Sequence, residues 1–168
     1  EVPIVKNKND SLNLIVWIGK FNSNKRPEMF IKLANKFTHQ NIKFVMMGGY
    51  KKNSSNLSLL RKIKDTENCI FLGRIPFDKS NSLLSKASLY INTSLNEGFP
   101  NTFIQSWLRQ TPVISMGVDP DQLIVKNDIG FVCNSFDDLF NKICFLTENP
   151  SSLKHMSERA AVFSQNRF

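Results

Sequence analysis

The sequence has few cysteines and histidines, and none of them is spaced like a metal ligand. Three cysteines and two histidines stand among 168 residues. His39 and His155 have no acidic or cysteine neighbour at ligand spacing, so we predict no metal site. Cys69, Cys133 and Cys144 each lie in an apolar stretch, which favours buried free thiols.

The sequence also lacks a long apolar run and a targeting signal. No apolar run approaches the roughly 20 residues that span a bilayer. The first residues, Glu1-Val2-Pro3-Ile4, do not form the charged-then-apolar pattern of a signal peptide. We therefore expect a cytoplasmic protein. A peripheral contact with the inner face of the membrane is left open.

Acidic residues are scarce relative to basic ones. The 22 basic and 14 acidic side chains give a net charge of +8. Such a charge suits an anionic ligand, an anionic membrane face or nucleic acid, but also a solvated lysine-rich surface. Most of the 14 phenylalanines fall at core spacing instead of forming exposed stacking rows, so we expect no nucleic-acid partner.

Strand-like and helix-like segments alternate along almost the whole chain, which is typical of a parallel sheet covered by helices. We predict an α/β, Rossmann-like parallel sheet of about six strands with helices on both faces. Residues 11–168 would form a single domain, and residues 1–10 an interdomain linker. The predicted strands are 12–18, 43–47, 69–72, 89–92, 112–115 and 130–133, and the predicted helices are 27–37, 57–64, 79–86, 100–109 and two helices within 136–163 that break at Pro150.

Two loops follow strands at the edge where parallel sheets bind ligands. Residues 19–26 carry three cations, and residues 93–102 carry Glu97 directly before Gly98 and a helix start at Pro100. The unpaired amides of that helix start would form an anion cradle, and Gly98 would let a ligand approach the backbone. The cations, the cradle and the carboxylate together suit a diphosphate attached to a polyol.

The helix after the second loop is predicted to be amphipathic. Its expected buried stripe is Phe103, Ile104, Trp107 and Leu108, and its expected polar face is Asn101, Gln105 and Arg109. Gln105 would then face the same cleft as the helix start. The residues alone leave another interpretation open, in which Glu97 only caps the helix and the lysines are solvated. No G-x-G-x-x-G nucleotide fingerprint is present to decide between them.

Six short motifs occur in order along the chain. They are Gly19-Lys20 with Lys25, Met47-Gly48-Gly49, Phe71-Leu72-Gly73-Arg74, Glu97-Gly98-Phe99-Pro100-Asn101, Thr111-Pro112-Val113-Ile114 and Gly130-Phe131-Val132. In this order, and with this strand placement, the sequence resembles the C-terminal, donor-binding domain of family 4 glycosyltransferases of GT-B fold. The resemblance implies a retaining transferase without metal or cofactor, whose acceptor-binding domain would lie N-terminal to Glu1.

The resemblance also implies a reaction. A hexosyl group would pass from a nucleoside diphosphate sugar to a saccharide or lipid-linked acceptor, in polysaccharide or glycoconjugate synthesis. Because the reaction would occur in a cleft between two domains, we expect the isolated domain to bind donor and to be inactive in transfer.

The family pattern assigns roles to particular residues. Glu97 matches a catalytic glutamate near the donor sugar, and Lys20 and Lys25 take the places of an arginine and a lysine that hold the diphosphate. Lys20 lacks the bidentate fork of arginine. Gln105 stands where the family has a second glutamate, on the ribose. The predicted donor-binding residues are Gly19, Lys20, Lys25, Arg74, Ile75, Gly98, Phe99, Pro100, Asn101, Thr102 and Gln105, with Arg74 and Ile75 beside the base.

Two other functions remain as alternatives. A nucleotide-sugar epimerase would use a related fold, but its catalytic acids and histidine find no match in the sequence. A non-enzymatic nucleotide- or RNA-binding module would use the positive charge.

Overall fold

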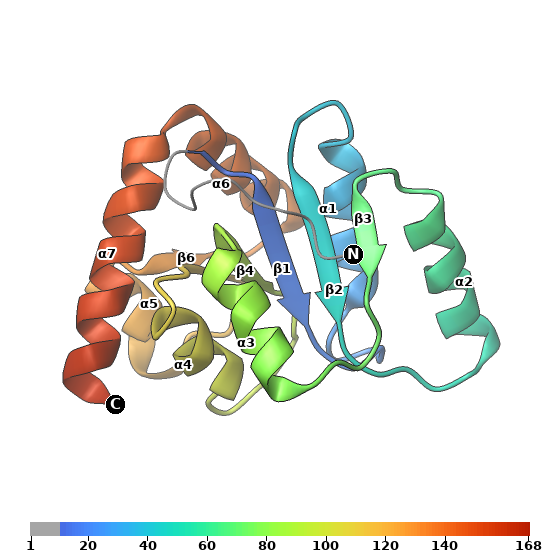
Figure 1. Cartoon of the computed structure of the whole chain (residues 1–168), viewed down its shortest axis with the longest axis horizontal. Helices are drawn as coiled ribbons and strands as arrows, with labels where there is room; N and C mark the ends of the chain where they lie inside the picture. Colours follow the sequence, from blue (N-terminus) through green and yellow to red (C-terminus); the bar gives the residue numbers. More distant parts are fainter. Residues whose placement is uncertain (1–10) are drawn as a thin grey trace.

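The computed structural model of the protein describes residues 11–168, so the predicted linker at residues 1–10 lies outside the described residues. Six parallel strands form one sheet in the order β3-β2-β1-β4-β5-β6 (Figure 1). The strands are β1 Leu14–Ile18, β2 Lys43–Met47, β3 Cys69–Phe71, β4 Leu89–Asn92, β5 Val113–Ser115 and β6 Gly130–Val132. The chain builds outward in one direction from β1 and then in the other from β4.

Helices cover both faces of this sheet (Figure 1). They are α1 Pro27–Lys36, α2 Ser54–Lys64, α3 Phe77–Lys86, α4 Asn101–Trp107, α5 Leu123–Asn127, α6 Phe136–Glu148 and α7 Pro150–Arg167, with a short 3-10 helix at Pro120–Gln122. The predicted Rossmann-like α/β fold is therefore confirmed. In the described part of the chain, no helix has the length and apolarity needed to cross a membrane.

The sheet is buried on both sides because its strands are apolar at successive positions. In β1, Ile15 and Trp17 enter one core, whereas Leu14 and Val16 enter the other. Successive side chains of a strand point to opposite faces, so an unbroken apolar run matches a central strand covered on both faces. The first core lies under α1 and α6, and the second under α3, α4 and α5.

Leu108 and Cys144 are less buried than predicted. Leu108 was expected in the buried stripe but is 49% exposed, because α4 ends at Trp107 and Leu108 is its C-cap residue. Ser106 takes a buried position instead, and its hydroxyl donates a hydrogen bond to the Thr102 carbonyl at 2.7 Å. Cys144 is half-buried, whereas Cys69 and Cys133 are buried as expected.

The prediction also missed α5 and the 3-10 helix before it. The Asp119 carboxylate accepts hydrogen bonds from the amides of Ile124 and Val125 at 2.9 and 3.3 Å. This capping lets a five-residue helix form, although its sequence is too short to show helical periodicity.

Backbone hydrogen bonds join the chain just after β1 to the end of β2, and the loop after β2 to the loop after β3. The amide of Gly19 donates to the Met47 carbonyl at 2.9 Å, and the amide of Gly48 donates to the Gly73 carbonyl at 2.8 Å. Gly48 has a φ of +141°, and a Cβ placed there would lie only 1.8 Å from the Gly19 carbonyl oxygen. Only glycine fits this close approach of two backbones.

We expect Gly48→Ala to lower the free energy of unfolding by about 3 kcal/mol, through backbone strain and the clash with Gly19. Gly98→Ala is the matched control, because a Cβ at Gly98 would meet no heavy atom within 4 Å. Denaturant unfolding of both variants measures the difference. Equal stabilities would contradict the close approach at Gly48.

Candidate functional site

The strand order reverses between β1 and β4, which are neighbours in the sheet. The loops that leave these two strands therefore diverge from a switch point, where open α/β sheets bind their ligands. Residues 19–26 leave β1, and residues 93–100 connect β4 to α4. The two predicted ligand-binding loops are thus brought together by the topology of the sheet.

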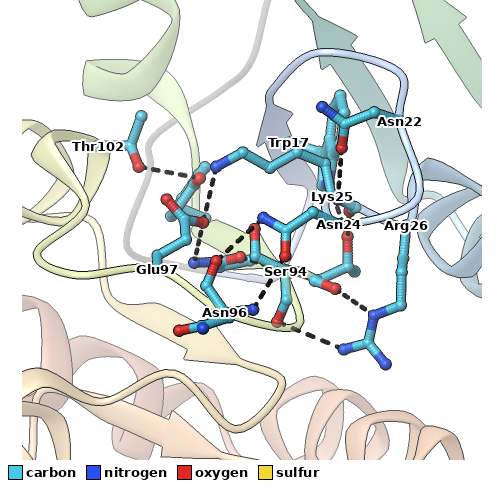
Figure 2. A network of polar contacts seen from close by, with 12 residues as sticks. Trp17, Asn22, Asn24, Lys25, Arg26, Ser94, Asn96, Glu97 and Thr102 are labelled. Atoms are coloured by element: carbon cyan, nitrogen blue, oxygen red, sulfur yellow. Dashed lines mark hydrogen bonds and ion pairs between the residues drawn. The ribbon is translucent and has the colours of Figure 1, made fainter.

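Hydrogen bonds join the two loops directly (Figure 2). The Asn24 side chain donates to the Asn96 carbonyl at 3.0 Å and accepts from the Asn96 amide at 3.2 Å. The backbone of the same asparagine accepts a hydrogen bond from the Leu95 amide at 2.8 Å. A side-chain amide that satisfies a backbone donor and acceptor together fixes both the distance and the orientation of the facing loop.

Arg26 is the second link between these loops. Its Nε donates to the Thr93 carbonyl at 2.6 Å, and its second guanidinium nitrogen donates to the Ser94 carbonyl at 3.4 Å. The Thr93 hydroxyl donates to the Lys25 carbonyl and accepts from the indole nitrogen of Trp17 at 2.9 Å. Arg26 is therefore a structural cation, whereas the sequence pattern counted it only as one of three cations in its loop.

Lys25 and Glu97 meet across the joined loops. The Lys25 ammonium lies 2.8 Å from Glu97 Oε1, and the two side chains are 26% and 16% exposed. Asn92, at the buried end of β4, donates from Nδ2 to the same Glu97 oxygen at 3.1 Å and accepts from the Ser94 amide at 2.7 Å. The carboxylate is therefore oriented by the strand end as well as by the lysine (Figure 2).

The pKa of the Glu97 carboxyl lies below its ordinary value of 4.5. Burial raises this pKa, but hydrogen bonds from Lys25, Ser94 and Asn92, together with the charge of Lys25, outweigh burial. Glu97 is consequently ionised at neutral pH. An ionised carboxylate accepts hydrogen bonds from hydroxyl groups and stabilises nearby positive charge, but it has no proton to donate.

The start of α4 adjoins this ion pair. Gly98 and Phe99 are exposed, and Pro100 precedes the helix without a side-chain cap for its first amides. Asn101 is exposed, whereas Thr102 accepts a hydrogen bond from the buried Tyr90 hydroxyl at 3.1 Å. Burial raises the pKa of Tyr90, so its phenol stays protonated and continues to donate to Thr102.

Gln105 lies one turn further along α4 and is half-buried. Its backbone carbonyl accepts from the Arg109 guanidinium at 3.0 Å. Within residues 11–168 its side-chain amide forms no hydrogen bond. The amide is therefore free to bond to a ligand, whereas the orientation of Gln105 toward the helix start stays a prediction.

Lys20 and Arg74 lie elsewhere, around a cavity of about 590 Å³ on the side of α1 and α2. The Arg74 guanidinium lies against Gly49, 3.2 Å from the position that a Cβ there would occupy. Ile75 packs against the second core. Lys25 and Glu97 do not line this cavity, so the structure divides the predicted site residues into two groups.

Sequence reasoning missed three residues that build the ion-pair site, namely Asn24, Asn92 and Asn96. A signal existed for Asn92, since a polar side chain ends an otherwise apolar strand at the ligand-binding edge. No comparable signal marked Asn24 and Asn96. Within the described residues, no group of three or more His, Cys, Asp or Glu side chains could hold a metal ion.

The sequence from residue 2 to residue 163 matches the family described as glycosyl transferases group 1. This match covers nearly the whole chain, so the protein belongs to that family. The family activity is glycosyl transfer, and the crevice at the β1/β4 switch point is the part of the fold in which such a family would hold its ligand.

Several characterised or named proteins are similar to this chain. An uncharacterized glycosyltransferase of Haemophilus influenzae is 26% identical over 90% of the chain and 44% of its own length. The human GDP-Man:Man(3)GlcNAc(2)-PP-Dol alpha-1,2-mannosyltransferase is 24% identical over 100% of the chain and 38% of its own length. The alpha-galactosylglucosyldiacylglycerol synthase of Streptococcus pneumoniae is 23% identical over 93% of the chain and 42% of its own length. The chain thus spans less than half the length of these relatives.

Solved structures share the fold. TarM of S. aureus, crystallised with Fondaparinux, alpha-GlcNAc-glycerol and UDP, superposes with a TM-score of 0.81 at 19% identity, over 100% of this chain and 35% of that one. HepE of Anabaena, crystallised with UDP and glucose, superposes with a TM-score of 0.77 at 15% identity, over 96% of this chain and 45% of that one. These likenesses establish the Rossmann-like fold of the chain.

The ion pair makes a pH-dependent prediction. In Lys25→Met, Glu97 loses a hydrogen bond and a positive charge that both lower its pKa, so we expect this pKa to rise. In the unchanged protein the folded-state pKa of Glu97 lies below its ordinary value. The stability that this carboxylate contributes is therefore present above pH 4.5, and it is lost as the pH falls through the folded-state pKa. Lys25→Met should therefore lose less stability than the unchanged protein when the pH is lowered.

A carbon-detected NMR titration of the Glu97 carboxyl measures this shift, and thermal melts at several acidic pH values measure the stability. Lys20→Met is the matched control, because Lys20 belongs to the same loop but lines the cavity instead of contacting Glu97. A Glu97 pKa that stays unchanged in Lys25→Met would contradict the ion pair.

Proposed function

We propose that this chain is the nucleotide-sugar-binding, C-terminal domain of a family 4 glycosyltransferase of GT-B fold. The observation that carries the proposal is the Lys25–Glu97 pair, held at the switch point beside the uncapped start of α4. A cation, an ionised carboxylate and exposed backbone at one switch point of the sheet match the chemistry of a diphosphate joined to a sugar.

In this proposal each member of the pair binds one part of the donor. The Lys25 ammonium neutralises the diphosphate, on which negative charge grows as the leaving group departs. Glu97 accepts hydrogen bonds from sugar hydroxyls and stabilises the positive charge that develops on the sugar. In the absence of donor the two side chains hold each other in place, and this reduces the conformational entropy lost on binding.

The other predicted donor-binding residues have more peripheral roles. The amides from Gly98 to Thr102 face the phosphates, and Gln105 bonds to ribose hydroxyls with its otherwise unbonded amide. Because Lys20 and Arg74 line the cavity next to the Lys25–Glu97 pair, the donor extends along this edge of the sheet, with Gly19 and Lys20 beside the diphosphate and Arg74 and Ile75 toward the base. Neither a metal nor another cofactor has a role in this scheme, and transfer proceeds with retention.

The donor is a nucleoside diphosphate hexose, and the acceptor is a saccharide or a lipid-linked saccharide. TarM and HepE were crystallised with UDP, and the human relative is named for GDP-mannose and a dolichol-linked acceptor. The pneumococcal relative is named for a diacylglycerol product, which supports a lipid-linked acceptor.

Transfer requires an acceptor hydroxyl held close to the reactive carbon of the sugar, and such positioning is worth roughly 7 to 11 kcal/mol. The described residues form one lobe around one sheet, and the relatives are more than twice as long as the chain. We therefore assign the acceptor to a second domain that precedes this one, and this chain alone binds donor without transferring it.

Lys25→Met tests the phosphate role. A hydrogen bond from a charged group is worth about 1.5–3 kcal/mol, so the variant should bind UDP or GDP roughly tenfold or more weakly. Binding of the free nucleosides should change little, since they carry no phosphate. Isothermal calorimetry measures both. Lys43→Met is the control, because Lys43 is exposed at the opposite end of the sheet. Equal losses for nucleoside and nucleotide would exclude this function for Lys25.

Gln105→Glu tests the ribose role. A carboxylate accepts stronger hydrogen bonds from hydroxyls than an amide does, so nucleotide affinity should be preserved or improved, by up to about tenfold. Gln110→Glu introduces the same charge at an exposed position just beyond α4 and serves as the control. A large loss of nucleotide affinity in Gln105→Glu, with Tm unchanged, would show that Gln105 does not accept from the ribose.

A further inference from the structure

The loop between β4 and α4 is anchored unevenly. Its first half is held by Asn24, which accepts hydrogen bonds from the amides of Leu95 and Asn96. In its second half, within the described part of the chain, the amides of Gly98 and Phe99 form no hydrogen bond. These are amides that the proposed function assigns to the phosphates, so their direction must be set by packing.

An aromatic contact supplies that packing. Phe99 lies against Phe168, which directly follows α7, with ring centroids 6.3 Å apart and ring planes at 74°. The two side chains are 38% and 55% exposed, so neither ring is enclosed in a core. Edge-to-face pairs are favoured beyond the area that they bury. Because Phe99 stands between Gly98 and the buried Pro100, this contact orients the backbone of the second half of the loop.

The position of Phe168 is itself set by α7. Its amide donates to the Ser164 carbonyl at 3.0 Å, which continues the hydrogen bonding of the helix. Its ring also meets Phe163 edge to face, with centroids 6.2 Å apart. Phe163 in turn packs against the fully buried Trp107 of α4, at 5.4 Å. Ring contacts therefore run from the core beneath α4, through the end of α7, to the loop that precedes α4.

The rest of α7 is held on the fold. The helix packs against α4, and its last turn lies beside α4 at the carboxyl edge of the sheet (Figure 1). Arg159 donates from Nε to the Asp128 carbonyl at 2.9 Å, and another of its nitrogens lies 2.8 Å from the Asp128 carboxylate. These contacts join α7 to the end of α5, so Phe168 projects from a fixed element.

We infer that Phe168 is a positioning residue for the donor site. The end of α7 holds Phe99, and through Phe99 it holds the Gly98 and Phe99 amides in the direction from which they bind phosphate. The ring contact does not depend on the proposed function, whereas its effect on the donor rests on that function. Because coupling between two sites is reciprocal, a nucleotide bound at the loop should also reduce the motion of Phe168.

Phe168→Ala tests this coupling by calorimetry with UDP and GDP, and uridine and guanosine are the phosphate-free comparisons. The nucleotide that binds the unchanged chain should bind the variant about three- to tenfold more weakly, and its nucleoside should bind equally well. Phe168→Tyr should restore the affinity, because it keeps the ring. Val162→Ala is the matched control, since Val162 is a similarly exposed apolar side chain of α7, at 58%.

Nitrogen-15 relaxation of the 168-residue chain tests the contact without any ligand. Backbone order parameters of Gly98 and Phe99 should fall in Phe168→Ala and stay unchanged in Val162→Ala. Those of Leu95 should stay unchanged in both variants, because Asn24 holds that half of the loop. In a Phe99→Leu background, Phe168→Ala should have no further effect on nucleotide affinity, since the ring pair is already lost.

Four results would overturn the inference. Unchanged order parameters at Gly98 and Phe99 in Phe168→Ala would exclude the anchoring contact. A loosened loop with full nucleotide affinity would exclude the positioning role. Equal losses for nucleotide and nucleoside, or in Val162→Ala, would show a general disturbance of α7. If neither nucleotide bound the unchanged chain, the proposed function and the effect of Phe168 on the donor would both fail, and relaxation would still decide the contact.

Discussion

The hydrogen bonds between the loops after β1 and β4 are the constraint on which the site depends. Asn24 pairs with the backbone of Asn96, and Arg26 binds the carbonyls of Thr93 and Ser94. Without these links, each loop would place its charged side chain independently, and an exposed ion pair alone contributes only about 0–1 kcal/mol. The backbone links thus make the Lys25–Glu97 pair a consequence of the fold, with little conformational freedom left to lose when a ligand binds.

The cations of the β1 loop illustrate how tertiary structure separates similar residues. Arg26 donates to main-chain carbonyls, Lys25 contacts Glu97, and Lys20 lines the cavity over α2. Their order along the chain gives no hint of this division, because it follows from the turn at Asn22, whose side chain accepts from the Lys25 amide at 2.8 Å. Arginine suits the structural position, since its planar fork reaches two carbonyls at once.

The protein presents two distinct anion-attracting regions at one edge of its sheet. The crevice at the switch point contains an acid that holds its cation, whereas the cavity over α1 and α2 contains cations without acidic partners. The first arrangement suits a ligand with both charge and hydroxyls, and the second suits a more anionic group.

The sheet, the order of its main elements along the chain and the two loops that carry the predicted ligand-binding residues could be recognised from the sequence alone. Apolar runs and turn residues are local signals, so they fixed β1, β4 and α1 to within a few residues. It did not determine the end of α4, the capped helix α5 or the partners of Asn24 and Asn92, because capping and loop pairing depend on residues far apart in the chain. The meeting of Lys25 with Glu97, and the place of Lys20 and Arg74 around the neighbouring cavity, could be seen only in the folded chain, since the reversal of strand order at β1 and β4 sets which loops adjoin.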